Sequence, residues 1–102
     1  MKIVLVTAPV EAADSLAEKL VAERLAACVS RTGGVRSVYR WKGAVEHADE
    51  VQLVLKTSDA ALPRLVARIR ALHPYELPEI VALEVAWTLP EYALWVDAET
   101  SP

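Results

Sequence analysis

The sequence contains no phenylalanine and no asparagine, and only one residue each of cysteine, methionine and glutamine. The single cysteine, Cys28, excludes a disulfide within the chain and is typical of proteins in a reducing compartment. Asparagine, glutamine, cysteine and methionine are thermolabile side chains, and their depletion is typical of thermophilic proteins. We therefore expect a thermostable protein that has no internal disulfide.

Long hydrophobic runs and an excess of positive charge are also missing. No apolar run approaches the ~18 residues of a membrane-spanning helix, and the apolar start of the chain is too short for a signal peptide. The formal net charge is −3, which gives no general attraction for a nucleic-acid backbone. These absences predict a soluble, cytoplasmic protein that binds neither membranes nor nucleic acids.

The chain is rich in the residues of a packed core. Of its 102 residues 54% are hydrophobic, and these are mainly Val, Leu, Ala and Ile. No repeat, low-complexity segment or interdomain linker interrupts the order of the predicted elements. We therefore expect a single domain over residues 1–102.

Hydrophobic patterns predict four strands. Residues 3–7 and 80–86 are apolar without alternation, which is typical of strands that are covered on both faces. Residues 35–42 alternate between an aromatic and a basic face, and Gly43 indicates a turn before the return limb at 51–56. The sequence therefore predicts a long β-hairpin over residues 35–57, with at most ~12 residues on each side, which exceeds the usual strand length.

Helical spacing of apolar residues predicts three helices. The first covers residues 11–27 with one apolar face. The second begins at a cap provided by Ser58 or Asp59, tolerates Pro63 only in its first turn and ends at His73. A short last helix covers residues 89–99.

The order of these elements predicts an α+β fold, the ferredoxin-like βαββαβ sandwich with a C-terminal helix. In this fold a four-stranded antiparallel sheet carries both main helices on one face. The strand residues 3–7, 53–55 and 80–83 are nevertheless apolar on both faces. An uncovered apolar face would be a large exposed patch, so we expect self-association to cover it.

The least generic stretch is His73–Ile80, which ends a helix, turns and begins a strand. Pro74 and Pro78 hold it extended at both ends. Neither a nucleophile with a neighbouring base nor a set of several metal ligands surrounds its imidazole, phenol and carboxylates. The residues therefore predict no catalytic reaction, and we expect a protein that is not an enzyme.

The most specific motifs of the chain are His-Pro-Tyr-Glu at 73–76 and Trp-Lys-Gly at 41–43; the others are Ala27-Cys28-Val29, Tyr39, Leu55-Lys56-Thr57, Pro78-Glu79-Ile80, Tyr92 and Trp95. Together they extend along nearly the whole chain and resemble the CutA family of divalent-ion tolerance proteins. The resemblance implies a ferredoxin-like fold, a homotrimer resembling that of the PII signalling proteins, and an association with copper and other divalent cations. It implies no established reaction. Some relatives carry further cysteines proposed as copper ligands, and their absence here excludes a multi-thiol site within one subunit.

Three residues are candidate metal ligands. The Cys28 thiol suits Cu(I), although a cysteine after a helix of small apolar residues is often simply buried. The His73 imidazole is a second candidate, and its alternative role is to cap the second helix. Glu76 is a third, but one imidazole and one carboxylate make half of a divalent site, so further ligands must come from elsewhere or from another chain. We rank His73 above Cys28 because we expect His73 in a surface connection and Cys28 under the first helix.

Five residues are candidates for a ligand cleft between subunits: Trp41, Lys42, Glu46, Lys56 and Tyr75. The aromatic residues are equally suited to anchoring a subunit interface, and the lysines to solvated strand ends. His47 lies among Glu46, Asp49 and Glu50, a cluster that can hold a cation loosely or form a solvated hairpin tip.

The leading hypothesis is a trimeric divalent-cation tolerance protein that binds copper or another divalent cation weakly and catalyses no reaction. The alternative is a PII-like sensor or scaffold that binds a small molecule or a protein partner in intersubunit clefts.

Overall fold

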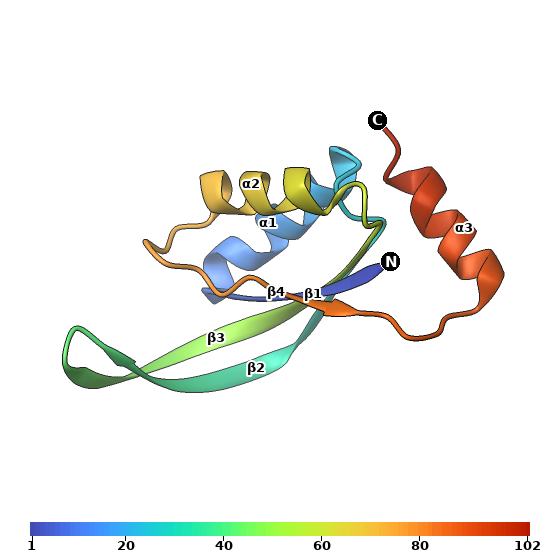
Figure 1. The fold of residues 1–102 in the computed structure, drawn as a ribbon. Helices are drawn as coiled ribbons and strands as arrows, with labels where there is room; N and C mark the ends of the chain where they lie inside the picture. The colour runs from blue at the N-terminus through green and yellow to red at the C-terminus, as the bar shows by residue number, and fades with distance from the viewer.

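The chain forms one four-stranded antiparallel sheet that carries two helices on one face, with a third helix beyond the end of the sheet (Figure 1). The computed structural model describes all residues, 1–102. In chain order the elements are β1 (Lys2–Ala8), α1 (Val10–Ala22), β2 (Cys28–Trp41), β3 (Ala44–Thr57), α2 (Leu62–Leu72), β4 (Val81–Glu84) and α3 (Pro90–Glu99). The predicted ferredoxin-like fold is thereby confirmed.

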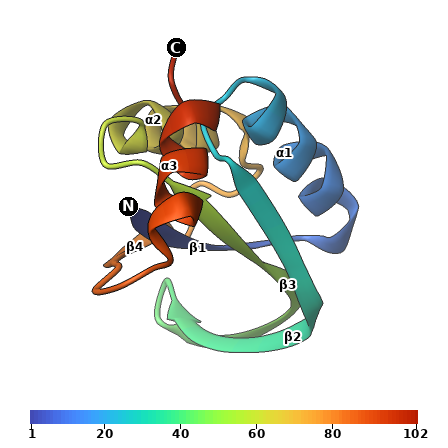
Figure 2. The same cartoon turned by 90° about the vertical axis from the view of Figure 1, so that its right-hand side faces the viewer.

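The strand order is β2-β3-β1-β4, so β1 lies centrally in the sheet. Lys2 in β1 stands opposite Thr57 in β3 on one side and Glu84 in β4 on the other. The connections through α1 and α2 return to the same face of the sheet, which places both helices on it (Figure 2).

The core lies between the sheet and these two helices. Alternate residues of β1 and β3 point toward the helices, because successive side chains of a strand face opposite ways. Val4 and Leu55, which stand opposite one another, are completely buried, as are Leu20 of α1 and Leu65 of α2. Burial of each such side chain contributes about 1.5–3 kcal/mol. None of the three helices is long and apolar enough to cross a membrane.

The hairpin is longer than predicted. Its strands β2 and β3 have 14 residues each and begin their pairing at Cys28 opposite Lys56. The register shifts between Arg31 and Gly34, an irregularity at the two adjacent glycines Gly33 and Gly34. At the tip, Lys42 has a φ of 49° and Gly43 a φ of 83°, the two positive values that a two-residue type I′ turn requires.

The predicted helix boundaries need correction. The helix α1 ends at Ala22 rather than at residue 27, and residues Leu25–Ala27 instead form a buried connection. The helix α2 begins at Leu62, and neither predicted cap side chain occupies its N-cap position, which is held by Ala61. The Ser58 hydroxyl accepts a hydrogen bond from the Ala61 amide at 3.1 Å, one turn before the helix.

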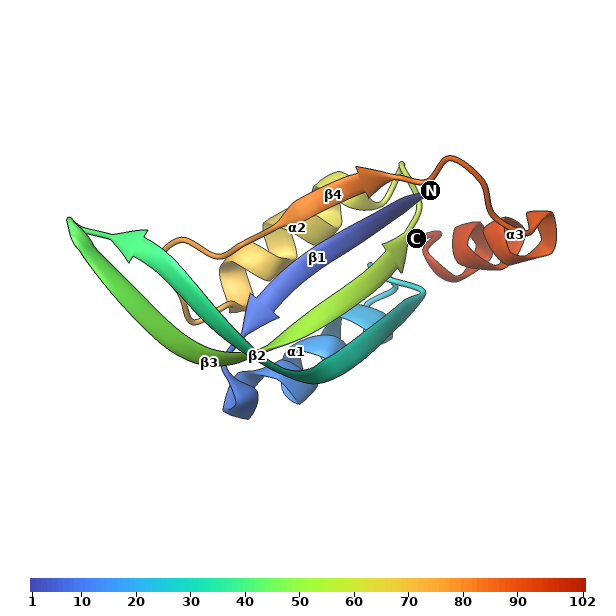
Figure 3. The same cartoon turned by 90° about the horizontal axis from the view of Figure 1, so that it is seen from below.

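The strand expected to be buried on both faces at 80–86 is shorter and more exposed than predicted. Only Val81–Glu84 pair with β1, and all four residues are exposed in the single chain. Val81 and Leu83 stand opposite Leu5 and Ile3, so these side chains share the sheet face that carries no helix (Figure 3). We call the apolar residues of this face, Ile3, Leu5, Val54, Val81 and Leu83, the open-face stripe.

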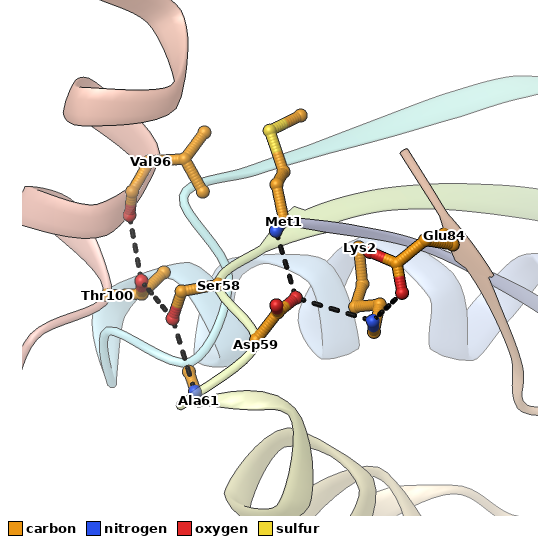
Figure 4. Close-up of polar contacts among 8 residues, drawn as sticks. All are labelled: Met1, Lys2, Ser58, Asp59, Ala61, Glu84, Val96 and Thr100. Carbon is orange, nitrogen blue, oxygen red and sulfur yellow. Dashed lines mark hydrogen bonds and ion pairs between the residues drawn. The ribbon is translucent and has the colours of Figure 1, made fainter. Parts of the chain in front are cut away.

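Polar contacts join the two ends of the chain to the start of α2 (Figure 4). The Thr100 and Ser58 hydroxyls hydrogen bond at 2.9 Å, which fixes the end of α3. The N-terminal ammonium donates to the Asp59 carboxylate at 2.9 Å, and Lys2 contacts both Asp59 and Glu84. These contacts lower the pKa of Asp59, chiefly through the hydrogen bond from the ammonium.

Candidate functional site

A cavity lies between the projecting hairpin and the segment that follows α2. We call this cavity of about 750 Å³ the hairpin hollow. One wall is the strand segment Val35–Trp41 of β2, and the opposite wall is Pro74–Leu77 with Glu79; Thr7 and Glu50 complete the lining. Residues far apart in the sequence therefore meet here.

The His73 side chain fixes the second wall. Its Nε2 lies 2.8 Å from the Thr7 carbonyl oxygen, and its Nδ1 accepts a hydrogen bond from the Tyr75 amide at 3.1 Å. Because the amide only donates and the carbonyl only accepts, Nδ1 is unprotonated and Nε2 carries the proton. The imidazole is therefore neutral, both of its nitrogens are used within the chain, and its exposure is only 7%.

Glu50 and Tyr75 join the two walls. The Tyr75 hydroxyl donates a hydrogen bond to the Glu50 carboxylate at 2.7 Å. Burial, and secondarily this carboxylate, raises the pKa of the Tyr75 phenol, so that it remains a neutral donor. The side chain of Glu50 is only 5% exposed, yet it forms no ion pair with any residue of the chain.

Other charges around the hollow are more exposed. The Arg36 guanidinium pairs with Asp49 at 3.1 Å, and the Lys42 ammonium lies 3.9 Å from the Glu76 carboxylate. The Lys42 ammonium also lies 5.6 Å from the centre of the Trp41 ring, within the range of a cation–π contact. The hollow thus combines aromatic rings with charges of both signs.

The structure gathers only part of the predicted ligand cleft. Trp41 and Tyr75 line the hollow, and Lys42 lies beside it through its contact with Glu76. Glu46 stands opposite Tyr39 in the hairpin but does not line the hollow. Lys56 does not line the hollow either; it lies beside Cys28 and Ser30, with its ammonium 3.2 Å from the serine hydroxyl.

The three predicted metal ligands are not brought together within the chain. Cys28 stands opposite Lys56 in β3, and Lys56 in turn stands opposite Ile3 in β1. His73 instead contacts Thr7, which lies about 13 Å from Ile3 along β1. No group of three His, Cys, Asp or Glu side chains is placed to hold one metal ion. The expected difference in access between His73 and Cys28 is also wrong, since His73 is buried and Cys28 is only half-buried.

The sequence patterns do not single out Glu50 and Glu79 as residues of the hollow. They group Glu50 with Glu46, His47 and Asp49 at a solvated hairpin tip, and those three residues are indeed more exposed than Glu50. No local pattern distinguishes Glu50, because its burial depends on Tyr75, which lies 25 residues away in the sequence.

Comparisons with known proteins point to one family. Residues 2–99 match the sequence profile of the family described as CutA1 divalent ion tolerance protein. The divalent-cation tolerance protein CutA of Thermus thermophilus is 47% identical over 100 residues, covering 97% of this chain and 97% of that protein. The CutA protein of Mus musculus is 41% identical over 96 residues, covering 93% of this chain and 54% of the mouse protein.

Solved structures agree with the sequence comparison. The apo form of the PII-like protein CutA from Nostoc sp. PCC 7120 superposes with a TM-score of 0.95 at 45% identity, covering 99% of this chain and 98% of that chain. The Thermus thermophilus structure gives a TM-score of 0.94 at 47% identity, covering 99% and 100%. The chain therefore belongs to the CutA1 family of divalent ion tolerance proteins and has its PII-like fold.

Proposed function

We propose that this protein is a cytoplasmic homotrimer that contributes to divalent-cation tolerance by binding copper or another divalent cation between its subunits, without catalysing a reaction. Membership of the family supports the role in tolerance. The open-face stripe supports self-association, because its apolar side chains need a cover that the single chain does not provide. The single cysteine supports a reducing compartment.

The observation that carries the intersubunit site is the separation of the candidate ligands. A cation usually needs at least three protein ligands, and no three suitable side chains converge in one chain. Threefold symmetry multiplies each ligand, so one residue per subunit is enough to complete a site. Cys28 and Glu76 are the candidates that retain access to solvent, whereas both nitrogens of His73 are already hydrogen bonded.

Copper titrations of metal-stripped protein test this proposal. We expect Cys28→Ala to weaken copper binding at least about tenfold, because a thiolate is the softest ligand of the chain. Glu76→Gln should weaken it less, and Glu46→Gln, which removes an equal charge outside the hollow, should leave it unchanged. Calorimetry gives the affinities, and light scattering verifies the assembly of each variant. Equal copper affinity in all four proteins, or no binding by the wild type, would contradict the proposal.

A second candidate function is the binding of a small molecule by a PII-like sensor. The observation that favours it is the hairpin hollow, whose volume of about 750 Å³ lies within the range of small-molecule sites. Aromatic rings and a few fixed polar groups, here Trp41, Tyr75 and Glu50, are typical of such sites.

A further inference from the structure

Glu50 is the starting point of a more specific inference about the hairpin hollow. This residue is only 5% exposed and lines the hollow, and its carboxylate accepts a hydrogen bond from the neutral Tyr75 hydroxyl. A buried charge without an opposite charge is costly, and proteins usually pair it. A cation that entered the hollow would supply the opposite charge that Glu50 lacks within the chain.

Two other carboxylates, those of Glu76 and Glu79, line the same hollow. Glu76 already has the Lys42 ammonium at 3.9 Å, whereas Glu79 has no ion pair. No three acidic, histidine or cysteine side chains converge closely enough to hold one metal ion. A ligand that matches this arrangement must therefore carry separated positive charges rather than one concentrated charge.

The lining between the carboxylates suits the hydrocarbon part of such a ligand. Tyr39, Trp41 and Tyr75 present aromatic rings, which attract ammonium groups and pack against methylene groups. The arginines do not cancel this preference. The Arg36 guanidinium is paired with Asp49. Val35 is the residue of β2 that stands opposite Glu50, and Arg40 lies five residues, or about 16 Å, farther along β2.

We propose that the hairpin hollow binds a linear aliphatic diamine or polyamine, with one ammonium group at Glu50 and a second at Glu79. The inference rests on the second candidate function above and not on copper binding. The Glu50–Tyr75 hydrogen bond holds the first carboxylate in place before the ligand arrives, and the aromatic rings enclose the chain of methylene groups.

Putrescine is the probe, and butylamine is its matched control because it has the same carbon chain and only one ammonium group. We expect putrescine to bind the assembled protein at least about tenfold more tightly than butylamine, since each buried charged hydrogen bond contributes strongly. Calorimetry measures binding, and tryptophan fluorescence reports on Trp41 in the hollow.

Three variants test the placement of the ligand. Glu50→Gln keeps an oxygen that accepts the Tyr75 hydrogen bond but removes the charge, and it should lower putrescine affinity at least about tenfold. Glu79→Gln should lower it severalfold. Glu46→Gln removes the same charge from an exposed position outside the hollow and should leave the affinity unchanged.

Four outcomes would overturn the inference. They are equal binding of butylamine and putrescine, equal loss in Glu46→Gln and Glu50→Gln, displacement of putrescine by equimolar magnesium, and no binding of any amine by the wild type. Copper titrations of the same variants distinguish a failure of the amine proposal from a failure of the copper proposal. Glu50→Gln should lose putrescine affinity but retain copper affinity.

Discussion

The Glu50 carboxylate and the Tyr75 phenol show how one hydrogen bond shapes the hollow. The bond joins β3 to the segment after α2 across 25 residues of sequence. Beside it, the His73 and Tyr75 rings lie 4.8 Å apart, and His73 ties the same segment to β1. These three side chains therefore position one wall of the hollow against the sheet.

Tyr75→Phe tests this bond through stability and its pH dependence. Near neutral pH we expect a loss of about 1 kcal/mol, because Glu50 loses its only donor while the ring remains. The raised pKa of Tyr75 means that the folded state keeps its phenolic proton where the unfolded state, with a pKa of about 10, releases it. The free energy of unfolding of the wild type should therefore fall as pH rises above about 10. The same rise in pH should lower it less in Tyr75→Phe, which has no phenol at this position.

Denaturant unfolding at neutral and alkaline pH measures both effects. The pKa of Tyr92 is also raised by burial, so it contributes in the same direction in both proteins and cancels in the difference. An alkaline loss that is identical in wild type and Tyr75→Phe would show that the phenol is not protected by the fold.

The contacts of single side chains were harder to predict from the sequence than the helices and strands. The sequence identifies His73, Tyr75 and Trp41 as unusual, and two of them line the hollow. It does not reveal that the His73 nitrogens are used by Thr7 and Tyr75, because those contacts depend on how α2 ends against β1. Nor does it reveal that Lys56 lies beside Cys28 and Ser30, because these neighbours follow from strand register.

Among the elements, the hairpin depends on its two-residue turn. Gly43 has a φ of 83°, a conformation that disfavours any side chain, whereas Gly33 and Gly34 at the bulge have no positive φ. An added Cβ meets no atom within 4 Å at any of the three glycines. The difference between these positions is therefore one of backbone conformation and not of space.

Gly43→Ala and Gly34→Ala form a matched pair of substitutions. We expect Gly43→Ala to destabilise the hairpin by about 1 kcal/mol, because alanine is strained at positive φ. Gly34→Ala should be neutral or slightly stabilising, since alanine restricts the unfolded chain without strain. Hydrogen exchange of the β2 and β3 amides compares them, and equal protection in both variants would contradict the assigned turn.

Helices and strands were predicted well where the pattern of neighbouring residues determines them. They were predicted poorly where contacts with distant residues determine where an element ends. Alternation along 35–42 and the glycine after it predict the hairpin, because both are properties of neighbouring residues. The first helix was predicted too long, since residues 25–27 are apolar for burial in a connection and not for a helix face. Periodicity alone does not separate these two causes.

At the scale of the whole molecule, the open-face stripe is the dominant feature. Val81 and Leu83 are 43% and 47% exposed, although the sequence has the apolar pattern of a covered strand. The apolar pattern of this strand indicates that another surface covers its open face, but it does not identify that surface. Self-association is the explanation proposed above.

Leu83→Glu tests whether this stripe is an interface. In an isolated chain the change should cost little, because the side chain is half exposed to water. In an assembly that buries Leu83, a carboxylate would be left without a partner, and we expect dissociation to smaller species. Val10→Glu, at a residue of 49% exposure at the start of α1, is the control.

Light scattering over a range of concentrations gives the mass of each variant. The proposed homotrimer requires a trimeric mass for the wild type and for Val10→Glu, and a lower mass for Leu83→Glu. A wild type that remains monomeric, or a Leu83→Glu variant of unchanged mass, would remove the stripe from the interface.

The central position of β1 also has a consequence for the order in which the chain folds. During synthesis β1 emerges first, but its two neighbours are β3, which ends at Thr57, and β4, which ends at Glu84. The hairpin partners β2 and β3 are adjacent in the chain and can pair at once, whereas Lys2 must wait for a residue 82 positions later. Among the four strands of the sheet, β1 is thus synthesised first and paired on both sides last, and until then its unpaired edges need protection from other nascent chains.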